Sequence, residues 1–123
     1  MQIKLASITV SDQTKALHFY TTVLGFTKQT DITNGPFRWL TVFSPDGVVG
    51  VELVLEPMGF APAGIYQKTR FEAGIPFTAF FTRIAAEFQR LKSLGVRFRG
   101  SRNSITARFT GNHQGAYLNI GHD

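Results

Sequence analysis

Apolar and polar residues alternate near the start of the chain, and this period of two predicts a half-buried strand at residues 3–10. Apolar positions at helical spacing follow and predict a helix at residues 13–23, with Asp12 as its N-cap and Gly25 as its terminating glycine. Turn signals separate three further predicted strands, at residues 26–32, 37–43 and 49–55. The first half of the chain therefore predicts one strand, one helix and three strands, in that order.

Residues 57–74 interrupt this pattern. Prolines and glycines are frequent there, which predicts a connector containing a short helix near residues 65–71. The earlier order of elements then returns. We expect a strand at residues 76–82, an amphipathic helix at 84–94 ended by Gly95, strands at 96–99 and 105–109, and a last strand at 116–120.

The repetition extends to individual residues, because Leu24-Gly25 and Leu94-Gly95 stand 70 residues apart at the same point of each unit. We interpret the chain as a single α+β domain of two βαβββ modules, at about residues 1–56 and 75–123, joined by the connector 57–74. One module alone would expose the apolar face of its sheet, so it needs a partner. Pairing two modules would give a curved, cup-shaped mixed sheet with the helices outside, and a concave surface suits a small ligand.

Composition narrows the class of protein. With 123 residues, of which 43% are hydrophobic and 17% charged, the chain has the make-up of one folded globular domain. It has no cysteine, which excludes disulfides and thiolate zinc sites. It also lacks both a signal-like start and a stretch near the roughly 18 apolar residues of a membrane span, so we expect a soluble cytoplasmic protein. Twelve phenylalanines exceed the needs of a thin sheet, and some are expected to line a cavity or a homodimer interface.

Charge is unevenly distributed along the chain. Residues 1–61 carry four basic and five acidic side chains, whereas residues 62–123 carry nine basic and three acidic ones. Four arginines, at positions 97, 99, 102 and 108, follow one another without an intervening acid. This run is typical either of an anion or nucleic-acid patch or of an edge strand whose cations discourage pairing with other chains. Since no nucleic-acid motif accompanies the charge, we favour the edge strand and expect no nucleic-acid partner.

The segment Asp12-Gln13-Thr14-Lys15-Ala16-Leu17-His18-Phe19-Tyr20, followed by Leu24-Gly25-Phe26, resembles the first helix motif of a known superfamily. This is the glyoxalase, bleomycin-resistance and extradiol-dioxygenase superfamily, also called the vicinal oxygen chelate superfamily. Residues 51–57 are similar to the end of its first module, and Gly95 with residues 115–120 to its second. The resemblance covers nearly the whole chain. It implies the fold more strongly than the activity, because members do unlike things on one scaffold.

The resemblance also indicates where a metal ion would be held. Metal-dependent members use four side chains, one each from the first and last strands of both modules, and these positions here correspond to Leu5, Glu52, Pro76 and Asn119. Leu5 and Pro76 have no side-chain donor, and Asn119 offers only a neutral amide oxygen. One carboxylate and one amide are too few for a tight site. We therefore predict no metal ligands and no required cofactor.

Glu52 is the strongest candidate for a site residue, because alternation directs it away from Leu53 and Leu55 and the resemblance places that direction in the cavity. It is interpreted as a general base, as a carboxylate that pairs with a ligand, or as a leftover acid solvated by water in the cup. Trp39 and Thr41 share one face of their strand, although alternation leaves open which face that is. Alternation, combined with the cavity-facing positions that the resemblance implies, gives a predicted ligand-binding set of Leu5, Ser7, Glu52, Pro76, Thr78, Tyr117 and Asn119.

Other candidates are weaker. His18 falls on the polar side of the first predicted helix, His113 lies in a turn and His122 near the end of the chain, all positions that favour solvent exposure. No nucleophile motif or phosphate-binding loop occurs in the sequence. We therefore favour a homodimer that binds a small organic molecule without a required metal, the ligand being anionic or neutral if Arg97 or Arg99 reaches the mouth of the cup. The alternatives are a lyase, isomerase or dioxygenase with a divergent metal site or with Glu52 as base, and a dimerising protein whose cup is vestigial.

Overall fold

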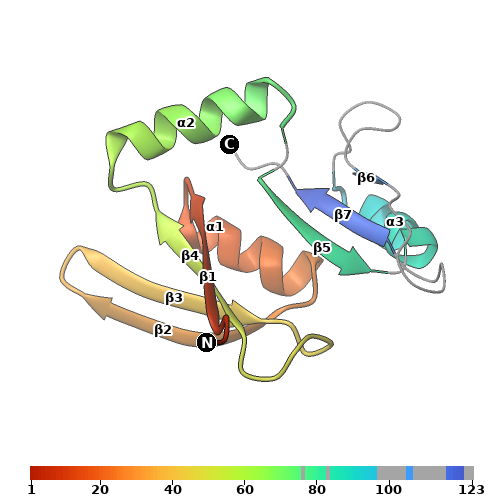
Figure 1. Ribbon diagram of the computed structural model, residues 1–123, viewed down its shortest axis with the longest axis horizontal. Coiled ribbons are helices and arrows are strands. Elements are labelled where there is room, and N and C mark those ends of the chain that lie inside the picture. The colour runs from red at the N-terminus through yellow and green to blue at the C-terminus, as the bar shows by residue number, and fades with distance from the viewer. Residues whose placement is uncertain (76, 83, 97–104, 107–115, 121–123) are drawn as a thin grey trace. The chain divides into compact units, whose positions relative to one another are not determined.

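The computed structural model describes residues 1–75, 77–82, 84–96, 105–106 and 116–120. The chain divides into two compact units, Met1–Gly64 and Ile65–Asp123. The first unit consists of β1 (Leu5–Val10), α1 (Gln13–His18), the π-helical turn η1 (Phe19–Val23), β2 (Thr27–Asn34), β3 (Phe37–Phe43) and β4 (Glu52–Pro57) (Figure 1). This order confirms the predicted first module of one strand, one helix and three strands.

The first unit contains a mixed four-stranded sheet in the order β1-β4-β3-β2. β1 runs parallel to β4, whereas β2 and β3, and β3 and β4, pair antiparallel. The β2–β3 hairpin turns at Asn34-Gly35, and Gly35 has a φ of 60°, a conformation that favours glycine. β4 begins three residues later than predicted, because Gly50 with a φ of 85° and the bond from the Val51 N–H to the Val48 oxygen (3.4 Å) belong to the preceding turn.

The first helix has the predicted N-cap but an unexpected last turn. The Asp12 carboxylate accepts a hydrogen bond from the Lys15 N–H at 2.9 Å, as an N-cap should. The predicted helical range of residues 13–23 is confirmed, but its last part is π-helical, because the Leu24 N–H donates to the Phe19 oxygen five residues back. At this point the Thr21 hydroxyl also donates to the carbonyl oxygen of Leu17 (2.7 Å), a bond that commonly bends helices.

The core of the first unit lies between the sheet and its helix. One face of the sheet, here called the helix face, presents the buried side chains Ile8, Val10, Leu40, Val42 and Leu55. Tyr20 of η1 is fully buried and makes edge-on contacts with the rings of Phe19 and Phe26, with centroids 5.5 and 5.7 Å apart. Burial raises the pKa of the Tyr20 hydroxyl well above its usual range.

Gln13, the first residue of α1, joins the helix to two strands. Its Nε2 donates to the backbone oxygens of Arg38 (3.0 Å) and Leu55 (2.9 Å). The β3–β4 pairing covers residues 41–42 and 53–54, so both carbonyls lie beyond it. The side-chain amide therefore supplies hydrogen bonds to two backbone carbonyls just beyond the β3–β4 pairing.

The second unit holds a three-stranded antiparallel sheet in the order β5-β7-β6, formed by β5 (Thr78–Thr82), β6 (Ile105–Thr106) and β7 (Ala116–Ile120), together with α3 (Ile84–Ser93). Before it, α2 (Ala61–Glu72) is a twelve-residue helix that begins in the first unit. The prediction of a short helix near 65–71 was therefore too short, since Pro62 is tolerated in a first turn whose N–H groups have no helical partner. No helix within the described ranges is long and apolar enough to cross a membrane.

In both units, the first described strand after the helix runs in the same direction as the strand before the helix. In the first unit, the alternating directions of β2, β3 and β4 make β2 run the same way as β1. In the second, the antiparallel pairs β5–β7 and β6–β7 make β6 run the same way as β5. The last strand of the first unit, β4, is parallel to β1, whereas β7 is antiparallel to β5 in the second unit. Apart from Val96, Ile105 and Thr106, the hairpin predicted at 96–99 and 105–109 lies outside the described residues.

Candidate functional site

Glu52 is the first residue of β4, and parallel pairing with β1 places Leu5 directly opposite it. Ser7 lies opposite Val54 in the same register. Residues that oppose each other across strands lie on the same face of a sheet. Leu5, Ser7, Glu52 and Val54 thus share the face opposite the helix face, and we call it the Glu52 face.

The register of β3 shows which face of the sheet Trp39 and Thr41 occupy, which alternation alone could not decide. Thr41 opposes Val54, so Thr41 and its i−2 neighbour Trp39 both lie on the Glu52 face. Ile32 of β2 opposes Trp39 and belongs to the same face. All four strands of the sheet therefore supply residues to this face.

A hydrogen-bonded chain fixes the Glu52 carboxylate to this face. The Thr41 hydroxyl donates to Oε1 of Glu52 at 2.8 Å, and the Thr30 N–H donates to the Thr41 Oγ1 at 3.1 Å. The pairing of β2 with β3 shifts between Lys28 and Thr30, which leaves Gln29 as an extra residue of a β-bulge. Thr41 itself is fully buried. Sequence reasoning missed its link to Glu52, because neither the bulge nor the register of β3 can be read from alternation.

Large apolar side chains surround the edge of this face. Leu5 is 45% exposed and Trp39 47% exposed, although both are strand residues. Ile32 and Phe37 are also exposed, and Phe37 falls on the same face because it lies two residues from Trp39. Exposed apolar residues grouped around a polar centre commonly mark a binding surface.

The residues of the first unit do not fit the metal site of metal-dependent relatives. The direct cross-strand partner of Glu52 is Leu5, whose side chain has no lone pair to donate. The carboxylate already accepts the Thr41 hydroxyl. Among the described residues, no three histidines, cysteines, aspartates or glutamates come together. We therefore derive no chemistry that depends on a metal ion at Glu52.

The second unit arranges its predicted site residues differently. Thr78 opposes Ile120, whereas Asn119 opposes Ala79, so Thr78 lies on one face of this sheet and Asn119 on the other. Tyr117 opposes Phe81. Pro76 lies outside the described residues. The part of the predicted site that the structure brings together is thus Leu5, Ser7 and Glu52, and the roles of Pro76, Thr78, Tyr117 and Asn119 stay predictions.

The remaining sequence candidates lie away from this face or outside the described residues. His18 is exposed on α1, with its Nδ1 3.4 Å from the hydroxyl of Thr22. His113, His122 and the four arginines of the basic run fall outside the described part of the chain.

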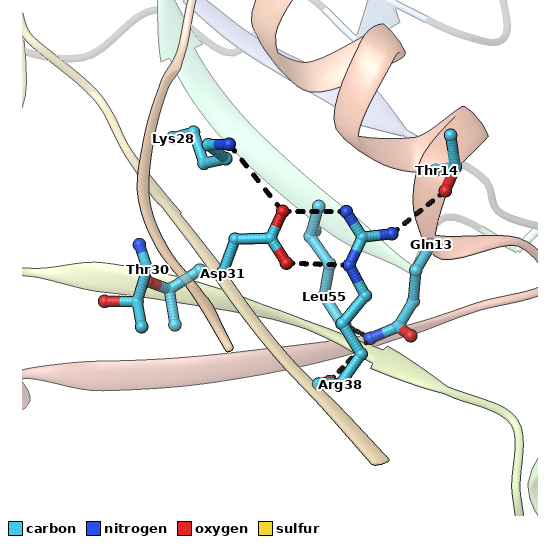
Figure 2. A network of polar contacts seen from close by, with 8 residues as sticks. Gln13, Thr14, Lys28, Thr30, Asp31, Arg38 and Leu55 are labelled. Atoms are coloured by element: carbon cyan, nitrogen blue, oxygen red, sulfur yellow. Dashed lines mark hydrogen bonds and ion pairs between the residues drawn. The ribbon is translucent and has the colours of Figure 1, made fainter. Parts of the chain in front are cut away.

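A second polar network occupies the helix side of the first unit (Figure 2). The Nε and Nη2 atoms of Arg38 donate to the two carboxylate oxygens of Asp31 at 2.8 and 2.9 Å, and Nη1 donates to the Thr14 hydroxyl at 2.9 Å. Lys28 adds a contact of 3.7 Å to Asp31. The Arg38 guanidinium lowers the pKa of the Asp31 carboxyl, and Asp31 raises the pKa of Arg38. Two cations of the first unit are thus engaged with Asp31, away from Glu52.

Comparison with known proteins identifies the class. Residues 2–110 match the family model of the Glyoxalase/Bleomycin resistance protein/Dioxygenase superfamily, and the chain belongs to that superfamily. The resemblance that the helix motif indicated is thereby confirmed. The uncharacterized protein YurT of Bacillus subtilis (strain 168) is 48% identical over 99 residues, which cover 80% of this chain and 78% of YurT.

Solved structures agree with the α+β fold. UcmS2 is 25% identical, with a TM-score of 0.70 and 97% of each chain covered. TnmS3, described as an antibiotic binding protein from Streptomyces sp. CB03234, is 25% identical with a TM-score of 0.60, covering 98% of this chain and 96% of that one. The likeness extends over nearly the full length of the chain and confirms the predicted fold class.

Proposed function

We propose that the protein binds a small organic molecule on the Glu52 face and needs no metal ion to do so. The observation that supports this most directly is the position of Glu52, which is anchored by a buried hydroxyl and faces Leu5 where a metal-dependent relative would supply a second ligand. A fixed acceptor beside an exposed aromatic and an exposed aliphatic side chain suits recognition of an organic molecule with a polar group.

The relatives support the same reading. The superfamily includes bleomycin-resistance proteins, and TnmS3 is described as antibiotic binding. We extend this to the present chain as an antibiotic-like or metabolic ligand. We also propose that the protein works as a cytoplasmic homodimer, since a second copy would cover apolar residues that one chain leaves exposed.

Trp39 makes ligand binding measurable without a label. It is the sole tryptophan and lies on the Glu52 face, 47% exposed, so an occupant of this face should change its emission. A thermal-shift screen of acidic, neutral and cationic small molecules, followed by titration of Trp39 fluorescence, tests the proposal. We expect at least one compound to raise the unfolding temperature and to alter the emission with the same saturation curve.

Two controls separate this site from others. Glu52→Gln should weaken binding of such a compound, whereas Glu72→Gln, an exposed carboxylate of α2, should leave it unchanged. Equal binding by wild type and Glu52→Gln would show that the Glu52 face is not the site. Mass spectrometry of protein purified without chelator tests the metal-free claim, and one equivalent of iron, nickel or zinc per chain would contradict it.

A further inference from the structure

The direction of the Thr41 hydroxyl determines which oxygen of Glu52 is left for a ligand. A threonine hydroxyl has one proton to donate and two lone pairs that accept. A backbone N–H can only donate, so the Thr30 N–H occupies a lone pair of Thr41 Oγ1 at 3.1 Å. The hydroxyl proton then points to Oε1 of Glu52 at 2.8 Å. The ionised carboxylate is an acceptor at both oxygens, and Thr41 uses one of them.

The surroundings hold this arrangement in place. Thr41 is fully buried in the middle of the sheet, opposite Val54, and its branched side chain has few rotamers. The β-bulge at Gln29 interrupts the regular pairing next to Thr30, whose N–H donates to the Thr41 side chain. The Glu52 side chain is therefore fixed through Oε1 before any ligand arrives.

Charge on the described part of the first unit leaves Oε2 as an acceptor. Lys28 and Arg38 contact Asp31, and Lys15 lies exposed on α1. The carbonyl oxygen of Lys4 accepts the Glu52 N–H at 2.9 Å, while the Lys4 Nζ lies beside Gly50. Within the described residues, no cation forms an ion pair with Glu52. Glu56 lies on the same face, four residues along β4 from Glu52, and adds negative potential there.

From this geometry, and resting on the proposed function, we infer that Oε2 of Glu52 recognises a hydrogen-bond donor, an N–H or O–H group, carried by the ligand next to its apolar part. Thr41 is the positioning residue for this contact, acting through Glu52. A ligand that offers only ether or carbonyl oxygens at this point forms no hydrogen bond with Oε2, because both partners are acceptors. An anionic ligand is disfavoured for the same reason, which opposes the expectation drawn from the basic run of the sequence.

Matched naphthalenes test the inference by ligand-observed NMR titration of the full chain. The probes are 1-naphthalenemethanol and 1-naphthylmethylamine, which carry donors, and the methyl ether of the alcohol, which has the same apolar part without a donor. We expect wild type to bind each donor probe about tenfold more tightly than the ether. Equal affinity for the alcohol and the ether would overturn the inference while leaving small-molecule binding intact. Failure of all three to bind would also overturn the inference, whereas the proposed function is overturned only if no compound of the thermal-shift screen binds.

Variants then separate positioning from structural support. In Glu52→Gln the amide oxygen can still accept the Thr41 hydroxyl, which turns Nε2 outward as a donor. An alcohol oxygen accepts from this donor as well as an ether oxygen does, so the ratio of alcohol to ether affinity should fall to about one. Thr41→Val should reduce the ratio of alcohol to ether affinity to less than about threefold without weakening the ether. Thr41→Ser, which keeps the hydroxyl, should retain the ratio. Loss of affinity for all probes alike in Thr41→Val, or an undiminished preference for the alcohol in Glu52→Gln, would contradict the assigned roles.

Discussion

Replacing Thr41 by valine tests the hydrogen-bonded chain through stability. The substitution keeps the branched shape but removes the oxygen that accepts from the Thr30 N–H and donates to Glu52. Two hydrogen bonds are lost at a position with no solvent exposure to replace them. The bulged N–H of Thr30 and the carboxylate of Glu52 then lose their partner, and such losses cost more than the bond itself contributes.

The magnitude follows from the two bonds. A neutral hydrogen bond contributes about 1 kcal/mol and one to an ionised group about 1.5–3 kcal/mol. The added valine methyl returns roughly 0.8 kcal/mol of hydrophobic burial. We therefore expect the free energy of unfolding to fall by about 1.5–3 kcal/mol in Thr41→Val. Thr41→Ser loses one methyl but keeps both bonds, so its loss should be about 1 kcal/mol.

Urea unfolding followed by circular dichroism measures both variants. A double-mutant cycle with Glu52→Ala isolates the contact, because the Thr41→Val loss should shrink by about 1.5–3 kcal/mol when the carboxylate is already absent. If Thr41→Val costs less than about 0.5 kcal/mol, or if the two substitutions simply add, the hydroxyl does not hold Glu52 and the reasoning is refuted.

Three further predictions concern the frame around the site. The pKa of Asp31 is lowered in the folded protein, so its ion pair with Arg38 stabilises the fold above the unfolded pKa of about 3.9, and this stabilisation is lost as pH falls through the folded pKa. Asp31→Asn should therefore have a lower free energy of unfolding than wild type at pH 7. The difference between the two proteins should disappear on acid titration below about pH 4. Gln13→Ala should lower the free energy of unfolding by about 1–3 kcal/mol, since two backbone carbonyls lose their donor, and an unchanged urea midpoint would contradict this. Gly25→Ala should cost about 1 kcal/mol because of its φ of 83°, whereas Gly59→Ala, also without an atom within 4 Å but lacking a positive φ, should be nearly neutral; equal effects would show that backbone strain is not the cause.

Much of the fold could be predicted because its signals are local. The Asp12 cap, the turn at Asn34-Gly35 and the glycines that end the helices depend on a few neighbouring residues, and the structure confirms them. The π-helical turn at residues 19–23 could not be read from spacing, because the same apolar positions suit an ordinary α-helix. The length of α2 was missed because Pro62 and Gly64 resemble loop residues, although a first turn accepts proline.

The candidate site was predictable only in part. Alternation placed Glu52 away from Leu55, and the resemblance directed attention to Leu5, which the structure sets opposite Glu52. Thr41 was paired with Trp39 but not with Glu52, because that contact depends on the register between β3 and β4. Register is fixed by contacts between distant segments, so it has no local signal in the chain.

The two faces of the first sheet also bear on how such a protein can change over generations. Leu55 of β4 is fully buried against the helix, whereas its neighbours Val54 and Glu56 lie on the Glu52 face. Substitutions at exposed positions such as Leu5, Ile32 and Trp39 remove little from the core, so a lineage can exchange them while the fold survives. Thr41 and Val54 are buried on that same face, so they stay constant while the exposed residues around them vary. A population of such chains could therefore acquire a new ligand by altering every second residue of a strand and keeping the residues between.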